Sequence, residues 1–229
     1  MPPAHIKHTL ALACNILAME GHLDLTLGHV SARADDRTFY LKQSEFGLDE
    51  ITPDRIVLLG YDGDRLDGEG GVHREFPLHA EILRARPDVG SVVHTHPPHV
   101  IALDATGTSI RPVSHDGILF ASDAPVFTKT SDLIDKPELG QQVVHTLGDA
   151  PAMILRYHGI VAVGAGIEEA CTRAIFLERA ARIQLLAASG GSYSWTPDNE
   201  LEGKLRNVFD PALMRSYWEY WVRKLQRSR

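Results

Sequence analysis

Three histidines have the spacing of a metal-binding site. His94 and His96 lie two positions apart in the β-rich run 91–96. Because alternate residues of a strand share a face, both imidazoles can point toward one ion. His158 follows a second apolar run and precedes Gly159, so rigid structure would also hold this third imidazole. Spacing alone leaves one alternative open for His94 and His96: two surface histidines at the end of a strand.

Glu75 is the fourth candidate ligand. It lies directly before a helix that we expect to begin at Pro77, with His79 four residues further on. A carboxylate there could instead be a first-turn residue stabilised by the helix dipole, and the spacing does not choose between the two. Three neutral imidazoles and a carboxylate suit Zn²⁺ first, and also Mn²⁺, Fe²⁺ or Co²⁺. We therefore predict one divalent metal ion, with Zn²⁺ as the first choice.

The elements that must position these residues follow from the hydrophobic pattern. Strands are expected at 38–41, 56–59 and 91–96, and a turn at Gly28 should lead into another. A further strand, 152–157, should deliver His158 and continue through 160–163. Helices are expected at 4–20, from Pro77 to just before Pro87, at 168–188 and from Pro211 onward. Strands and helices are mixed without regular alternation, which argues against a doubly wound parallel sheet.

The composition narrows the class of partner and the compartment. The chain has 229 residues and a formal charge of −7, which argues against nucleic acid or an anionic membrane as the main partner. Two isolated cysteines favour a reducing compartment. The N-terminal apolar run is too short for a signal peptide, and no run reaches the ~20 apolar residues that span a bilayer. We expect a cytoplasmic protein with one domain, 1–229, including a C-terminal helical extension at 197–229.

Taken together, these motifs resemble the class II aldolase/adducin family. The resemblance rests on His94-Thr95-His96, Glu75, His158-Gly159 and Gly28-His29-Val30-Ser31, and it covers roughly residues 5–190. It implies an α/β fold, a three-layer α/β/α sandwich with a largely antiparallel central sheet. It also implies a homotetramer with sites at subunit contacts. The family's metal ligands carry over to His94, His96 and His158, and its ligand or base to Glu75. A metal there would stabilise an enolate as a Lewis acid.

Departures from the family pattern bear on the substrate. Three small polar loops bind phosphate in its sugar-phosphate members, and here they read Gly28-His29, Ser44-Glu45 and His73-Arg74. The Glu45 carboxylate would repel a phosphate dianion, whereas the Arg74 guanidinium can bind a carboxylate through two hydrogen bonds. We therefore expect a small-molecule carboxylate as the partner. The residues expected to contact the substrate are Gly28, His29, Ser31, Ser44, His73 and Arg74.

A fourth departure bears on the reaction. The phosphate aldolases place a proton-donating tyrosine after a histidine from the neighbouring subunit, and the matching pair here is His115-Asp116. Family members with a Gly-His-Val-Ser-Ala-Arg motif, as at 28–33, resemble decarboxylases of hydroxylated aromatic or heteroaromatic acids. The resemblance therefore implies decarboxylation through a metal-stabilised enolate. Glu75, His115 or Asp116 would return a proton to carbon. The bland alternative for His115-Asp116 is a hydrogen-bonded turn before Gly117.

Other functions remain open at this point. One is aldol cleavage of a non-phosphorylated hydroxy or oxo acid. Others are dehydratase, epimerase or, with Fe²⁺, dioxygen chemistry at the same metal. A non-enzymatic adducin-like binding module is a further alternative, although such modules are expected to have lost the metal ligands. The C-terminal aromatic residues favour packing, or closure over a neighbouring subunit's site; they are Tyr217, Trp218, Tyr220 and Trp221.

Overall fold

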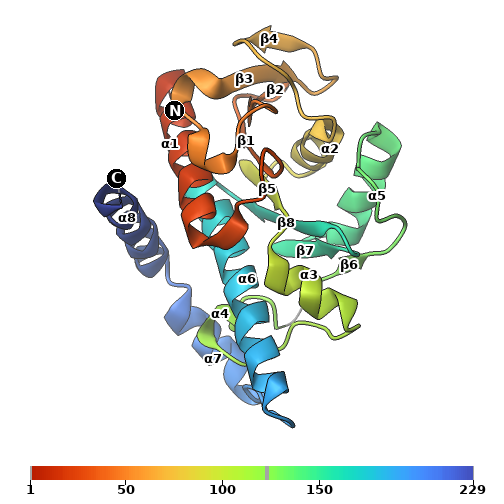
Figure 1. The fold of residues 1–229 in the computed structure, drawn as a ribbon, viewed down its shortest axis with the longest axis vertical. Coiled ribbons are helices and arrows are strands. Elements are labelled where there is room, and N and C mark those ends of the chain that lie inside the picture. The colour runs from red at the N-terminus through yellow and green to blue at the C-terminus, as the bar shows by residue number, and fades with distance from the viewer. Residues whose placement is uncertain (1, 122–123, 229) are drawn as a thin grey trace.

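A computed structural model describes residues 2–121 and 124–228. These residues form one β-sheet with helices on both faces (Figure 1). The strand order is β4-β3-β2-β1-β5-β8-β7-β6, and every neighbouring pair except β6 and β7 is antiparallel. This arrangement confirms the predicted α/β sandwich. The strands are β1 (His29–Arg33), β2 (Thr38–Lys42), β3 (Ile56–Gly60), β4 (Arg65–Asp67), β5 (Ser91–Thr95), β6 (Val126–Phe127), β7 (Ala152–Leu155) and β8 (Gly159–Gly164).

The helices form the two outer layers. The first half of the chain contributes α1 (Pro3–Leu17), continued by the short η1 (Ala18–His22), then η2 (Leu48–Glu50), η3 (Pro53–Arg55), α2 (Phe76–Ala85) and α3 (Pro98–Ala105). The second half contributes α4 (His115–Ile118), α5 (Pro137–Leu147), α6 (Ile167–Ser189), α7 (Asp198–Val208) and α8 (Pro211–Arg227). Helices α1, α6 and α8 cover one side, and α2 and α5 cover the other (Figure 1). Within the described ranges, no helix is long and apolar enough to cross a membrane.

Alternation along the central strands creates a separate core on each face of the sheet. On β8, Ile160 packs into the core beneath α1 and α6, and Val161 packs into the core beneath α2 and α5. On β5, Val92 belongs to the α2 side. His94 lies two residues after Val92, so its side chain also points to the α2 side. The sheet therefore aims His94 toward α2, the helix that follows Glu75.

The predicted strand through His158 is wrong in one respect. The chain does not continue straight from 152–157 into 160–163, because it turns at 156–158 and β8 runs back antiparallel to β7. Tyr157 adopts a left-handed backbone conformation with φ of 57°. Its backbone N–H donates to the Asp104 carboxylate from α3 at 3.0 Å. A Cβ on Gly159 would lie 2.4 Å from the Thr95 carbonyl oxygen, so glycine allows the hairpin to approach β5.

The C-terminal range predicted as a helical extension contains α7 and α8. Trp221 and Leu225 of α8 are buried in the core on the α1 and α6 side. The rings of Tyr217 and Trp221 lie 5.6 and 5.9 Å from the ring of Phe176. These contacts favour packing as the role of the C-terminal aromatic residues. That 1–229 is a single domain stays a prediction.

Candidate metal centre and active site

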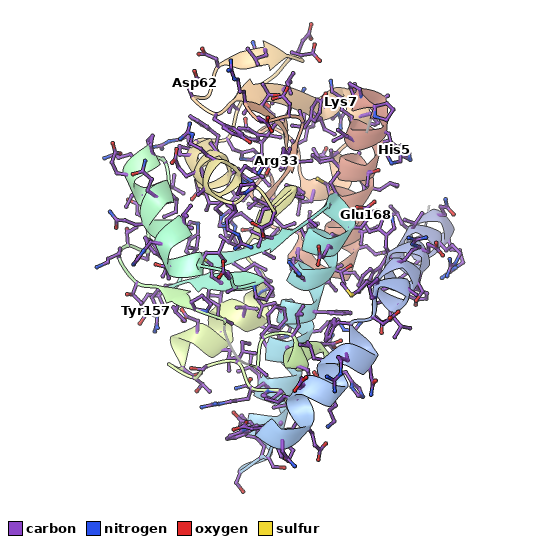
Figure 2. All side chains as sticks on the ribbon, turned by 180° about the vertical axis from the view of Figure 1, so that it is seen from behind. His5, Lys7, Arg33, Asp62, Tyr157 and Glu168 are labelled. Atoms are coloured by element: carbon purple, nitrogen blue, oxygen red, sulfur yellow. The ribbon has the colours of Figure 1, made fainter. Side chains whose placement is uncertain are left out.

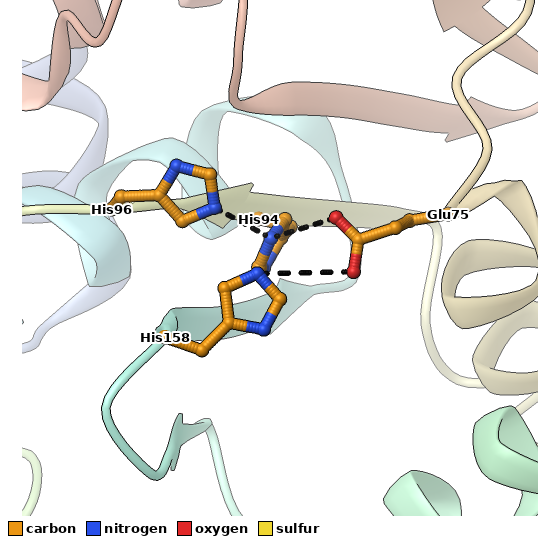
Figure 3. Close-up of side chains that lie close together, drawn as sticks. All are labelled: Glu75, His94, His96 and His158. Atoms are coloured by element: carbon orange, nitrogen blue, oxygen red, sulfur yellow. Dashed lines mark hydrogen bonds and ion pairs between the residues drawn. The ribbon is translucent and has the colours of Figure 1, made fainter. Parts of the chain in front are cut away.

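Glu75, His94, His96 and His158 converge at one point, and each offers a ligand atom within 4.8 Å of the others (Figure 3). They come from three separate places in the fold. Glu75 lies at the N-terminal end of α2, His94 is the last residue but one of the buried strand β5 and His96 follows that strand. His158 comes from the turn between β7 and β8. The geometry therefore brings together all four residues that were predicted as ligands.

Hydrogen bonds to the far nitrogens fix how two of the imidazoles face the centre. His94 Nδ1 donates to the Ile160 carbonyl oxygen at 2.9 Å, and His96 Nδ1 donates to the Asp24 carboxylate at 2.9 Å. Both Nε2 atoms therefore carry lone pairs, and they face one another at 3.1 Å. Two lone pairs at this separation repel unless a cation lies between them. The residues present therefore fit a divalent metal ion, and the two bonds orient the ligands as outer partners do in metal sites.

Electrostatics keep Glu75 charged and His158 neutral, the forms in which each binds a metal. Burial would raise the pKa of Glu75, but His94 and His29 outweigh this effect and hold the pKa below its ordinary value. The backbone N–H of Ile134 donates to Glu75 Oε1 at 2.8 Å and fixes the carboxylate. Burial, together with His94, lowers the pKa of His158 to about 4.

A cavity of about 630 Å³ opens beside the cluster. Its lining includes Glu75, His96 and His158. Five of the six residues predicted to contact substrate also line it: Gly28, His29, Ser44, His73 and Arg74. The side chain of Arg74 is 74% exposed, and its guanidinium pairs with Asp135 at 2.8 Å. The cavity thus joins three of the candidate ligands to a cationic side chain that can bind an anion.

Comparison with known proteins identifies the family. The model of the Class II Aldolase and Adducin N-terminal domain matches residues 8–185. The chain belongs to this family. It is 34% identical to a 3,4-dihydroxyphthalate decarboxylase from Arthrobacter keyseri over 212 residues, covering 86% of this chain and 85% of that protein.

Solved structures agree with the family assignment. An aldolase II superfamily protein from Pseudomonas syringae has a TM-score of 0.89 at 28% identity, covering 100% of this chain and 95% of that one. L-fuculose 1-phosphate aldolase from Glaciozyma antarctica PI12 shares the fold, with a TM-score of 0.86 at 22% identity over 98% of this chain and 89% of that one. With related proteins named as decarboxylases and aldolases, this class II aldolase family member is a lyase.

Ser31 is the predicted substrate contact that does not line the cavity. It is fully buried, and its hydroxyl is hydrogen-bonded to His79 Nδ1 at 2.7 Å. Arg33, in the same motif, is a structural residue. Its guanidinium donates to the carbonyl oxygens of Leu83, Arg86 and Val89 at the end of α2 and the segment that follows it. Figure 2 shows Arg33 beside that helix.

His115 and Asp116 lie away from their own chain's metal cluster. Together with α6, α7 and α8 residues they line a second cavity of about 410 Å³. Asp116 pairs with Arg179 at 3.1 Å, and burial raises the pKa of this carboxyl. The expectation for these two residues concerned the site of a neighbouring subunit. Their catalytic role therefore stays a prediction.

Sequence reasoning missed several residues around the site. Asp24 supports His96, and Asp104 holds the turn that presents His158. The loop of Ser131, Asp132 and Leu133 forms one wall of the cavity. No sequence spacing relates these residues to the candidate ligands. Each of them belongs to a loop or a helix that is distant in the sequence from the residue that it supports. The sequence analysis noted His79 four residues after Glu75 but predicted no role for it.

Proposed function

We propose that this lyase decarboxylates a hydroxylated or oxo-substituted carboxylic acid. Aromatic and heteroaromatic acids are the preferred class. The observation that carries the proposal is that Arg74 and His73 line the same cavity as three of the candidate ligands, Glu75, His96 and His158. The similarity to 3,4-dihydroxyphthalate decarboxylases supports it, because such a substrate has adjacent hydroxyl and carboxylate groups and a second carboxylate.

The chain's own residues suit this substrate. Glu75 and the three histidines would hold one divalent cation, with Zn²⁺ as the first candidate and Mn²⁺, Fe²⁺ or Co²⁺ as alternatives. Arg74 would bind the carboxylate that is retained, by exchanging Asp135 for substrate. His29 and His73 form the adjoining wall of the cavity and would orient the acid.

The reaction breaks the bond between the substrate carbon and its carboxylate carbon. CO₂ leaves, and the electron pair remains on the organic fragment. A bound divalent cation would supply Lewis-acid stabilisation of that negative charge. A proton then returns to the carbon, and Glu75 is the candidate donor or relay within the chain. His115 or Asp116 would serve if a neighbouring subunit brings them to the cavity. We therefore also propose a homo-oligomer, the tetramer that the family implies, and a cytoplasmic location.

Product analysis tests the proposal. Purified protein supplied with Zn²⁺ or Mn²⁺ is incubated with 3,4-dihydroxyphthalate, and CO₂ and the resulting dihydroxybenzoate are measured. A parallel reaction with L-fuculose 1-phosphate is assayed for aldehyde. We expect CO₂ from the aromatic acid, loss of that activity with a chelator and recovery when the metal is restored. Aldehyde production without CO₂ would overturn the proposal in favour of aldol cleavage.

Arg74→Met tests how the acid is bound. Removing the guanidinium should raise KM by about 10- to 100-fold, because a hydrogen-bonded charge pair contributes roughly 1.5–3 kcal/mol. The matched control is Arg84→Met, which removes a half-exposed arginine that pairs with Glu81 on α2 outside this cavity. Its KM should match that of the wild type. Equal KM values for both variants would contradict a role for Arg74 in binding.

A further inference from the structure

A buried hydrogen-bonded chain leads from the cavity into the protein. His29 Nδ1 lies 2.6 Å from His79 Nε2, and His79 Nδ1 lies 2.7 Å from the Ser31 hydroxyl oxygen. The three residues are at most 2% exposed. Only His29 lines the cavity, so His79 and Ser31 lie behind it. These hydrogen bonds join β1 to α2 on the face of the sheet that carries His94.

The carboxylate of Glu75 sets the direction of this chain. Glu75 Oε2 lies 3.6 Å from His29 Nε2, and a carboxylate can only accept. A hydrogen on His29 Nε2 is therefore favoured, whereas a lone pair there would face negative charge. A neutral imidazole has one donor and one acceptor, so His29 Nδ1 then accepts from His79 Nε2. His79 Nδ1 in turn accepts from the Ser31 hydroxyl.

We propose that His79 is a positioning residue that holds His29 as the tautomer with its hydrogen on Nε2, and that Ser31 completes this arrangement. The consequence is an N–H group aimed into the metal cavity beside Glu75. Such a group can donate a hydrogen bond to an oxygen of a bound acid. It would repel a substrate group that is only a hydrogen-bond donor. This last step rests on the proposed decarboxylase function. The direction of the hydrogen-bonded chain does not.

Nuclear magnetic resonance of histidine-labelled protein reads the direction without any substrate. In an N–H···N bond the two nitrogens have distinct chemical shifts, and a coupling passes between them. We expect the shared hydrogen to reside on His79 Nε2 and His29 to carry its hydrogen on Nε2, both with Zn²⁺ and without metal. A hydrogen on His29 Nδ1, or a doubly protonated His29, would overturn the proposal.

Variants at position 79 separate positioning from packing. The His79→Gln side chain can still donate to His29 Nδ1, whereas His79→Leu cannot. In the decarboxylation assay we expect His79→Leu to raise KM about tenfold with bound metal unchanged, and His79→Gln to stay within about threefold of wild type. A merely structural role predicts equal KM and an unchanged His29 spectrum in both variants, which would contradict the proposal.

A pair of buried serines provides a matched control. Ser91 is also fully buried, and its hydroxyl donates to the Ser31 carbonyl oxygen at 2.6 Å, outside the chain. Ser31→Ala should raise KM up to about fivefold, and Ser91→Ala should leave it unchanged. If the wild-type protein releases no CO₂ from any acid tested, the proposed function fails. The spectrum of His29 still decides the tautomer in that case.

Discussion

At the scale of single residues, the candidate metal centre depends on the groups that hydrogen-bond to its predicted ligands. Asp24 lies 2.9 Å from His96 Nδ1 and, as a carboxylate, would make that imidazole a stronger metal ligand. The backbone of Ile160 does the same for His94 without any charge. The two neighbouring ligands therefore differ in how easily a substitution can disturb them, because only the partner of His96 is a side chain.

Asp24→Asn should weaken metal binding by about 10- to 100-fold, because the amide orients His96 less well and adds no negative charge. Titration of the metal-free protein in competition with a coloured chelator measures the affinity. Asp62→Asn, in an exposed turn before β4, is the control and should bind as wild type does. Equal affinity in both variants would show that Asp24 does not support the ligand.

The ligands could be predicted from the sequence, but most of their supports could not. The spacing predicted His94, His96 and His158 and left two interpretations open for Glu75, and the family resemblance then supported all four. The placement of Asp24 depends on how the loop after η1 folds over β5, and no periodicity encodes such a contact. For Ser31 the opposite happened, because a predicted substrate contact proved to be a supporting residue. Its motif suggested a substrate contact, but the side chain points to His79 beneath the cavity wall.

At the scale of elements, Arg33 links β1 to the C-terminal end of α2 through hydrogen bonds. Its guanidinium reaches three carbonyl oxygens there and the Tyr61 hydroxyl at 2.7 Å. Carbonyls at a helix end lack partners within the helix, so an arginine that binds several of them stabilises the junction. Glu75 precedes the other end of α2, so we expect this junction to help to position its carboxylate.

Arg33→Met should lower the free energy of unfolding by about 2–3 kcal/mol, since the carbonyls lose a charged donor. Urea denaturation followed by circular dichroism measures the change. Arg37→Met, an exposed residue of the turn between β1 and β2, should change stability by less than about 0.5 kcal/mol. Similar losses in both variants would mean that the Arg33 contacts contribute nothing specific.

Strong periodicity made some elements predictable. Helix α6 and strands β2, β3 and β5 lie within a residue or two of their predicted bounds. The hairpin at 156–158 was missed because its apolar run has no glycine or proline before the turn. The contact from Asp104 that holds the turn is long-range. Helices α3 and α5 were not anticipated either, since Pro98 and Pro137 begin helices here and proline also ends them.

At the scale of the whole molecule, buried neutral histidines should make the metal-free protein sensitive to acid. Burial lowers the pKa of His22 to about 3 and that of His73 to about 3. The unfolded chain binds a proton at each near pH 6.5, before the folded chain does. Their contribution to stability is therefore complete above about pH 6.5 and is lost as the pH falls toward 3.

Between pH 7 and pH 5 we expect the free energy of unfolding to fall by about 2 kcal/mol for each such histidine. Urea denaturation at both values of pH checks this. His22→Asn can keep a polar group near the Thr95 hydroxyl and should make the pH dependence shallower. His145→Asn, on an exposed position of α5, should not. An identical pH dependence in all three proteins would contradict the explanation.

The pairing of His29 with His94 across β1 and β5 has a consequence for redesign of this enzyme. Two of the histidines that would hold the ion belong to β5 and the residue beyond it, and the third to the hairpin into β8. The groups that would recognise the acid belong to the beginning of β1 and to the segment before α2. If these positions bind the acid as proposed, we expect that grafting 28–29 and 73–74 changes the substrate preference and leaves the candidate metal ligands intact. A one-residue insertion within β1 would shift the register and turn its side chains to the opposite face of the sheet.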